Sequence, residues 1–168
     1  DNIGAVGVKL IDGTGMFLPE SKRNLPLPQI ALEKLLGKSD NYYVNSLNED
    51  EVGKSDVLVG AFMFLKSSIY KEVNGFDEDF FMYGEDIDLS YRIKKQGYQN
   101  FYFGEAKVIH FKGESSIKDR VYAKRFYNAM LVFYKKHFSV NIFLDFLIQI
   151  IIKLLPLISK TIKSNSLQ

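Results

Sequence analysis

Cysteine and tryptophan are absent from the sequence, and histidine occurs only twice in 168 residues. Without cysteine the chain can form no disulfide framework, no thiolate zinc site and no cysteine nucleophile. Two histidines also exclude a histidine-rich metal site. The composition, at 46% hydrophobic and 25% charged residues, is close to globular averages. It therefore excludes a disordered tail, a collagen-like fibre and a coiled coil.

The net charge of +2 conceals an asymmetry along the chain. Residues 1–116 carry 13 Lys/Arg against 18 Asp/Glu, whereas residues 117–168 carry 9 against 2. A basic tail suits either nucleic acid or an anionic membrane. No groove-reading motif appears and the basic residues lie on an apolar tail, so we expect no nucleic-acid partner. The chain begins at Asp1 without methionine or a signal pattern, and we expect it to be part of a longer protein.

Hydrophobic periodicity predicts an α/β core followed by two helices. The predicted strands are 3–11, 57–65, 99–103 and 107–111, of which 57–65 is apolar enough to be buried on both faces. The predicted helices are 29–36, 67–75, 85–96, 116–136 and 140–162. We expect Ser67 or Ser68 to cap the second of these, and Ser116 with Asp119 to form a capping box for the fourth. Segments 19–28 and 38–56 read as loops, with room for an edge strand at 42–44.

An acidic cluster precedes and opens the helix 85–96. Six acids fall within twelve residues: Asp77, Glu78, Asp79, Glu85, Asp86 and Asp88. A calcium-binding EF-hand loop read from Asp77 would need an oxygen ligand at its fifth position and glycine at its sixth. The sequence places Phe81 and Met82 there, which excludes this loop.

Glu85 and Asp86 fall in the first turn of that helix, where the helix dipole and free N–H groups favour an ionised carboxylate. Such a carboxylate can accept a proton from a hydroxyl nucleophile. The alternative is that these acids simply stabilise the helix start. Asp88 lies four residues before Arg92, so we expect an intrahelical ion pair rather than a site. His110 ends an apolar strand beside a glycine turn and suits either a metal or phosphate contact or an ordinary hydrogen bond.

The last predicted helix, 140–162, carries one narrow polar stripe on an otherwise apolar surface. At 100° per residue its polar positions fall within an arc of roughly 120°. They are Asn141, Asp145, Gln149, Lys153, Ser159, Lys160 and Lys163. Charges near its middle argue against a simple lipid span. The pattern fits a helix in the membrane interface, or one packed on the domain or on a second chain.

Three ordered blocks resemble the C-terminal half of a family 2 glycosyltransferase, in particular its bacterial rhamnosyltransferase-like branch. The blocks are VGAFMFLK at 59–66, VNGFDEDFFMYGEDIDLSYR at 73–92 and AKVIHFKG at 106–113. The resemblance implies part of a GT-A fold, a mixed sheet with flanking helices. It assigns residues 1–116 to the acceptor and base part of the catalytic domain. Residues 117–168 then form an amphipathic helical region associated with a membrane or a partner.

The resemblance also assigns roles to individual residues. Asp86 matches the catalytic base and Glu85 its flanking acid. His110 matches a position that contacts the metal or the donor diphosphate in some members. Gly60 and Ala61 match a small-residue turn beside the sugar, where a side chain would block close approach. Phe81 and Tyr83 would line the acceptor side, although ordinary core aromatics remain the alternative.

The family's metal-binding Asp-x-Asp and its nucleotide-binding elements lie in a preceding half that this sequence does not show. We therefore expect Mn²⁺ or Mg²⁺ in the full-length enzyme and none bound by this chain alone, which we expect to be inactive by itself. The implied function is inverting transfer of a sugar from a nucleotide-sugar to a glycan or lipid-linked acceptor. It would serve bacterial surface polysaccharide synthesis at the cytoplasmic face of the membrane.

Two other hypotheses remain. The first is a non-catalytic module for interaction or membrane attachment, which would bind a membrane surface or form a homodimer through the C-terminal helices. The second is a metal-dependent phosphoester hydrolase, which ranks last because its acids occupy one loop and one helix start rather than two converging clusters.

Overall fold

The computed structural model describes residues 2–27, 30, 33, 41–111, 120–139, 141, 142 and 145–150. The chain divides into two compact units. The first, which we call the sheet unit, contains Asp1–Asp77 and Glu85–Lys112. The second, the helical unit, contains Glu78–Gly84 and Gly113–Gln168. The domain boundary predicted after residue 116 stays a prediction.

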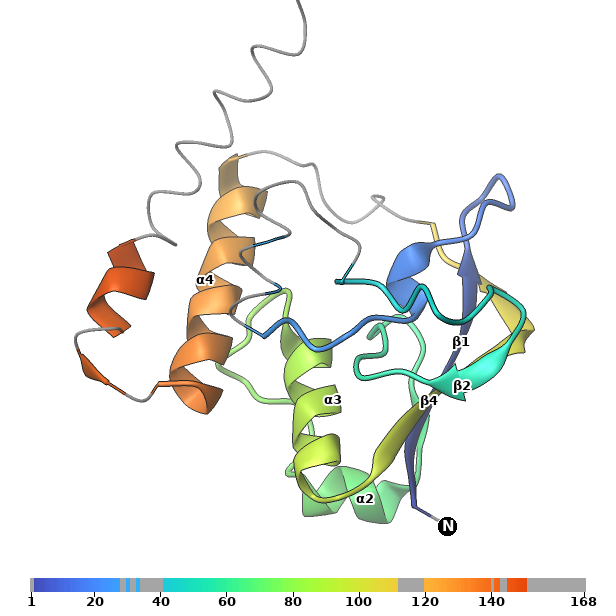
Figure 1. Ribbon diagram of the computed structural model, residues 1–168, viewed down its shortest axis with the longest axis horizontal. Helices are drawn as coiled ribbons and strands as arrows, with labels where there is room; N and C mark the ends of the chain where they lie inside the picture. The colour runs from blue at the N-terminus through green and yellow to red at the C-terminus, as the bar shows by residue number, and fades with distance from the viewer. Residues whose placement is uncertain are drawn as a thin grey trace, which may run out of the picture. The chain divides into compact units, whose positions relative to one another are not determined.

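A four-stranded mixed sheet with the order β2-β4-β1-β3 forms the sheet unit (Figure 1). The long strands β1 (Ile3–Ile11) and β4 (Gln99–Ile109) are parallel neighbours at its centre. The short strands β2 (Val52–Lys54) and β3 (Phe64–Leu65) are antiparallel and lie at the two edges. This mixed sheet with helices confirms the predicted α/β class.

β4 is one continuous strand, although the sequence predicts two. The register with β1 jumps between consecutive residues, because Val8 pairs with Phe103 and Lys9 pairs with Lys107. The residues between the two predicted strands are therefore a bulge within β4. Gly104 lies in this bulge and donates its N–H to Glu51 O at 3.1 Å. A Cβ there would lie 2.5 Å from Glu49 O, so the close approach of the 49–51 backbone requires glycine.

The prediction of one continuous buried strand at 57–65 is wrong. Only its first two residues are fully buried, and only its last two form a strand. Val57 and Leu58 are fully buried, and Val57 forms an isolated bridge with Arg23. The chain then turns, with the Phe62 N–H bonded to Val59 O at 3.1 Å, and pairs with β1 only at Phe64 and Leu65. Phe64 is 72% exposed. Apolar character alone does not reveal this turn, because its residues are as hydrophobic as those of a strand.

The loop predicted at 38–56 contains more structure than expected. β2 pairs with β4 within it, but three residues are too few to give an alternating pattern. At the proposed edge strand, Tyr43 forms only an isolated bridge with Arg23. Tyr42 and Val44 are buried rather than on the surface. The described part of this segment, 41–56, therefore contributes an edge strand to the sheet and two buried side chains.

Among the described residues of the sheet unit, two α-helices and one short 3₁₀ helix, η1 (Pro19–Ser21), flank this sheet. They are α2 (Ser67–Glu72) and α3 (Glu85–Lys95), close to the predicted bounds. Lys66 occupies the N-cap of α2 without a side-chain hydrogen bond, so the predicted serine cap is wrong. α3 runs back beside β4 (Figure 1). Its inner face joins one apolar cluster, made of Ala5, Leu58, Ile69, Val73, Leu89 and Ile93.

The helical unit contains α4 (Arg120–His137) and a further helical segment at 145–150. Within it, Lys136 Nζ lies 2.6 Å from Asp79 Oδ2, which ties the segment 78–84 to α4. The predicted capping box at Ser116 lies outside the described residues. So does the predicted helix 29–36, except for residues 30 and 33. Most of the predicted helix 140–162 also lies outside them. In the part of the chain that the structure describes, no helix is both long and apolar enough to cross a membrane.

Candidate active site

Asp86 lies in the first turn of α3 and is only 8% exposed. Its Oδ2 accepts two hydrogen bonds, one from Arg23 Nη2 at 2.7 Å and one from the Gly60 N–H at 3.1 Å. Its Oδ1 accepts the Ile87 N–H at 2.8 Å. These donors and the dipole of α3 all favour the ionised carboxylate. Three segments that are distant in sequence therefore meet at one carboxylate.

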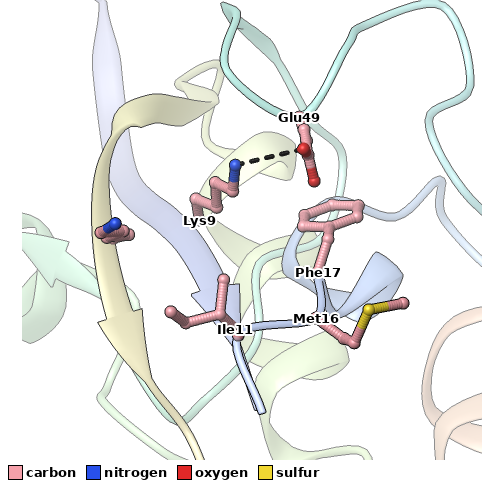
Figure 2. A pocket seen from close by; sticks show the side chains of 7 residues that line it. Lys9, Ile11, Met16, Phe17 and Glu49 are labelled. Carbon is pink, nitrogen blue, oxygen red and sulfur yellow. Dashed lines mark ion pairs between the residues drawn. The ribbon is translucent and has the colours of Figure 1, made fainter. Parts of the chain in front are cut away.

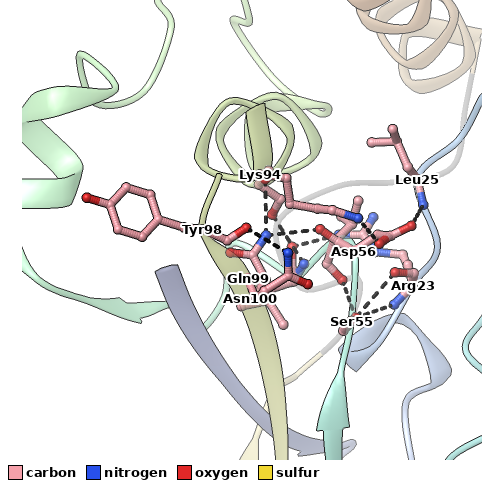
Figure 3. Close-up of polar contacts among 11 residues, drawn as sticks. Arg23, Leu25, Ser55, Asp56, Lys94, Tyr98, Gln99 and Asn100 are labelled. Carbon is pink, nitrogen blue, oxygen red and sulfur yellow. Dashed lines mark hydrogen bonds and ion pairs between the residues drawn. The ribbon is translucent and has the colours of Figure 1, made fainter. Parts of the chain in front are cut away.

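Arg23 reaches Asp86 from the segment that follows η1. Its main chain is bonded to Val57 in both directions, at 3.1 Å through its N–H and 3.0 Å through its carbonyl. Ser55 Oγ contacts the same main-chain N–H at 3.1 Å and the carbonyl at 3.2 Å (Figure 3). The Arg23 guanidinium also donates to Leu58 O at 3.0 Å. The fold thus fixes both the backbone and the charged end of this residue.

The buried charge of Arg23 is balanced by its neighbours. Burial would lower the pKa of the guanidinium, because it penalises the charged form. The negative charge of Asp86, followed by contributions from Tyr42, outweighs this and raises the pKa of Arg23 overall. Arg23 is consequently a permanent cation next to Asp86 throughout the working pH range.

Gly60 lies directly against the two acids at the start of α3. A Cβ built on Gly60 would make only ordinary contacts, at 3.4 Å from Asp86 Cβ and 3.7 Å from Glu85 Oε1. The φ angle of Gly60 is not in the left-handed region, unlike those of Gly15, Gly75, Gly84 and Gly97. Neither packing nor backbone geometry therefore requires glycine here. Beside it, Ala61 is exposed.

The two candidate acceptor-side aromatics belong to the helical unit. Phe81 is 81% exposed, and the Arg125 guanidinium lies 5.3 Å from its ring centroid. The core-aromatic alternative therefore does not apply to Phe81. Tyr83 has a positive φ of 71°, and its ring packs edge-on against Phe126 at 6.4 Å. Their acceptor role stays a prediction.

His110 follows β4 and is half-buried. Its backbone N–H bonds to Ile11 O at 2.8 Å, which continues the pairing with β1. Across the residues the structure describes, no three His, Asp or Glu side chains are grouped so as to hold a metal ion. One imidazole is too few ligands for a divalent metal site, so the described residues do not fit this group by themselves. The metal or diphosphate role of His110 stays a prediction.

A separate pocket of about 340 Å³ opens over the C-terminal end of β1 (Figure 2). It is lined by Lys9, Ile11, Gly15, Met16, Phe17, Glu49 and Lys107. Lys9 Nζ lies 2.8 Å from Asp50 Oδ1 and 3.3 Å from Glu49 Oε1. The bond to Asp50 contributes most to raising the pKa of Lys9. None of the residues predicted from the sequence to form the site lines this pocket, and we assign no function to it.

The structure thus brings Gly60, Glu85 and Asp86 together. It adds Arg23, which lies in the predicted loop 19–28 and has no predicted role. The intrahelical pair between Asp88 and Arg92 is confirmed, with Nη2 and Oδ2 2.6 Å apart. Arg23 lies 63 residues from Asp86. Its segment has no periodicity that would indicate a buried side chain, so no local signal identifies it.

Comparison with known proteins gives concordant matches. The model of the family described as "Glycosyl transferase family group 2" matches residues 39–163. Two relatives from Mycobacterium tuberculosis strains are both named N-acetylglucosaminyl-diphospho-decaprenol L-rhamnosyltransferase. Each is 30% identical over 122 residues, which are 69% of this chain and 40% of the relative.

A third relative is rhamnosyltransferase WbbL of Escherichia coli K12. It is 41% identical over 56 residues, which are 33% of this chain and 21% of the relative. The chain therefore spans 40% or less of the length of these relatives. No solved structure matches the chain.

Proposed function

The chain belongs to glycosyl transferase family group 2, and we propose from this premise that it forms the acceptor and base part of an inverting glycosyltransferase. The complete enzyme transfers a sugar from a nucleotide-sugar donor to a hydroxyl of a glycan or lipid-linked acceptor. The observation that carries the proposal is Asp86, a nearly buried carboxyl group held by hydrogen bonds from Arg23 and from the Gly60 N–H.

Asp86 acts as the general base in this proposal. The acceptor oxygen forms a bond to the anomeric carbon while its proton passes to the Asp86 carboxylate. The nucleoside diphosphate departs with the electron pair of the broken glycosidic bond. A single displacement of this kind inverts the anomeric carbon. Gly60 supports the assignment, because a glycine that neither packing nor φ requires leaves space against the two acids.

A divalent metal, where the complete enzyme binds one, would supply charge stabilisation to the departing diphosphate. We keep His110 as a candidate contact to that metal or to the diphosphate. No step of the mechanism above depends on it. That the present chain alone binds no metal also stays a prediction.

The names of the relatives indicate which substrates to test first. The two mycobacterial relatives are named for L-rhamnosyl transfer to an N-acetylglucosaminyl-diphospho-polyprenol. We therefore propose a deoxyhexosyl donor, with L-rhamnosyl as the first candidate, and a diphosphate-linked lipid acceptor. Phe81 and Tyr83 are proposed to contact the acceptor. The product would serve bacterial cell-envelope synthesis at the cytoplasmic face of the membrane.

The helical unit supports association with a membrane surface or a second copy of the chain. Asp145, on the polar stripe of the tail, accepts hydrogen bonds from Tyr134 at 2.9 Å and from Ser139 at 2.5 Å. Asp145 therefore faces α4. Of the described apolar residues of that segment, Ile148 is half-buried and four are exposed, namely Ile142, Phe146, Leu147 and Ile150. The same face would serve a non-catalytic attachment module, which is the alternative function.

The Asp86→Asn variant of the complete enzyme tests the proposal. Removing the base while keeping the shape of the side chain should lower kcat by roughly 10²–10⁴. Steady-state assays with a nucleotide-sugar and a polyprenyl-diphosphate acceptor measure this, and circular dichroism checks the fold. Asp50→Asn, the same chemical change at an exposed residue that pairs with Lys9, is the control. A folded Asp86→Asn enzyme with near-normal turnover would overturn the assignment of Asp86 as the base.

A further inference from the structure

The Asp86 carboxylate is held asymmetrically. Both donors from outside α3, Arg23 Nη2 and the Gly60 N–H, bind Oδ2. Oδ1 accepts only the N–H of Ile87, the next residue in the helix. A carboxylate oxygen has two lone pairs, so Oδ1 has capacity for one more proton donor.

We propose that Arg23 is the positioning residue for Asp86: by binding only Oδ2, it orients the carboxylate and leaves Oδ1 as the atom that accepts the acceptor's proton. This inference rests on the function proposed above. It assigns a role to a residue outside the three sequence blocks that indicated that function.

The geometry of the guanidinium supports this role over a purely structural one. Arginine pairs most strongly with a carboxylate through two parallel N–H···O bonds, which occupy both oxygens. Here only Nη2 contacts Asp86, while the buried Nε makes no hydrogen bond. A bidentate pair would engage Oδ1 as well. The single contact is therefore weaker than a bidentate ion pair, but it leaves Asp86 Oδ1 available to a further donor.

Arg23 is also fixed well enough to act as an anchor. Ser55 and Val57 hold its main chain, and Leu58 O accepts a second bond from Nη2. The side chains of Arg23 and Asp86 are only 9% and 11% exposed, so little water competes for the contact. An ion pair shielded in this way is screened far less by salt than one on the surface.

The charges around Asp86 make Arg23 the principal cation at this site. Glu85 precedes Asp86 on α3 and has its Oε1 near Gly60. Tyr42 interacts with Arg23, and Asp88 is paired with Arg92 on the same helix. If the Arg23 charge were removed, the repulsion between the two neighbouring carboxylates would no longer be balanced, and the Gly60 N–H would be the remaining described hydrogen-bond donor to Oδ2.

The experiment measures kcat and KM separately for Arg23→Met and Arg23→Lys in the complete enzyme. In Arg23→Met the Asp86 carboxylate loses its anchor, so kcat should fall by roughly 10²–10⁴-fold, the range for losing a general base. Arg23→Lys keeps the charge but not the geometry. It should restore kcat only in part, to roughly tenfold to 10²-fold below the wild type, since small misplacements of a catalytic group cost that much. The KM for the donor should stay unchanged.

Lys22→Met is the matched control. Lys22 is the adjacent buried cation, but its Nζ binds the Val44 and Leu47 carbonyls at 2.6 Å rather than Asp86. Its loss should lower stability without changing kcat. A kcat of wild-type size in folded Arg23→Met, or an equal fall of kcat in Lys22→Met, would overturn the inference. So would a kcat of wild-type size in Arg23→Lys.

The double variant Arg23→Met/Asp86→Asn separates this inference from the proposed function. If Arg23 acts only through Asp86, adding Arg23→Met to Asp86→Asn should lower kcat no further. A further fall as large as that in Arg23→Met alone overturns the role of Arg23. Turnover retained in Asp86→Asn would instead overturn the base assignment. The two results are independent.

Discussion

The Asp12 carboxylate organises the turn that follows β1. Its Oδ1 accepts hydrogen bonds from the Thr14 hydroxyl at 2.7 Å, the Thr14 N–H at 2.8 Å and the Met16 N–H at 3.0 Å. The bond from the Thr14 side chain is the largest cause that lowers the pKa of Asp12 below its ordinary value of 3.8, and the Met16 N–H follows. A lowered carboxyl pKa stabilises the folded turn above the unfolded value, and this contribution is lost as pH falls through the folded pKa.

We therefore predict that the turn 12–16 persists below pH 3.8 and loosens only at more acidic pH. The amide proton shifts of Thr14 and Met16, followed by NMR during acid titration, give the midpoint. In Thr14→Val, which removes the hydroxyl donor but keeps the backbone, the midpoint should rise toward 3.8. A wild-type midpoint at or above that value would contradict the prediction.

At the level of single residues, the sequence predicted Asp86 and Glu85 but not Arg23. The two acids stand in a local pattern, a helix start inside a recognisable block. The partner of Asp86 comes from 63 residues away, in a segment that is irregular in sequence. A local sequence pattern indicates the secondary structure and the chemical groups of a residue. Which distant residue those groups contact depends on the tertiary fold, which the local pattern does not determine. The burial of Lys22, next to Arg23, was not predicted for the same reason.

Among the elements, α3 depends on an ion pair inside the helix. Asp88 is fully buried, and its Oδ2 binds Arg92 through Nε at 2.7 Å and Nη2 at 2.6 Å. Arg92 also donates to Val73 O and, at 2.7 Å, to Gly75 O, so the pair connects α3 to the end of α2. Removing the charge of Asp88 would leave a partly buried guanidinium without its counter-ion.

Asp88→Asn should therefore lower the free energy of unfolding by about 3 kcal/mol, at the lower end of the range for breaking a buried pair. Urea denaturation followed by circular dichroism measures the change. Lys95→Ala, an exposed change on the same helix, should stay within about 0.5 kcal/mol. A loss equally small in Asp88→Asn would show that the pair is dispensable.

Helices and strands were predictable where periodic apolar residues or a glycine stop marked them. β1, α2 and α3 match their predicted positions because periodic apolar residues and glycine stops mark them. β2 was missed because three residues carry no period. The family resemblance placed a small-residue turn at Gly60 and Ala61, but hydrophobic periodicity did not, because a run of apolar residues can bend. Here it bends where the Gly60 N–H contacts Asp86.

For the whole molecule, the tail gives the clearest expectation. Exposed Ile142, Phe146, Leu147 and Ile150 present an apolar surface that a soluble monomer rarely leaves uncovered. We predict that the purified chain is a dimer or larger, or needs detergent, and that it sediments with anionic liposomes. Light scattering after size-exclusion chromatography and vesicle sedimentation measure these two properties.

Deletion of residues 138–168 is the matching variant. It should give a more soluble and more monomeric protein if the tail is peripheral, or an unfolded one if the tail closes the core. A full chain that is monomeric without detergent and ignores liposomes, with fold and solubility unchanged after deletion, would contradict every form of this expectation.

The central position of β1 has a consequence for how the protein can be divided. The match to the family model begins at residue 39, yet a middle strand of the sheet and the arginine that binds Asp86 both lie before it. A version trimmed to residues 39–163 would keep all three recognisable blocks. It would lose the strand between β4 and β3 and leave the Asp86 carboxylate without its cation. The boundary of recognisable similarity is therefore not a folding boundary, and expression of the matched region alone should begin no later than β1.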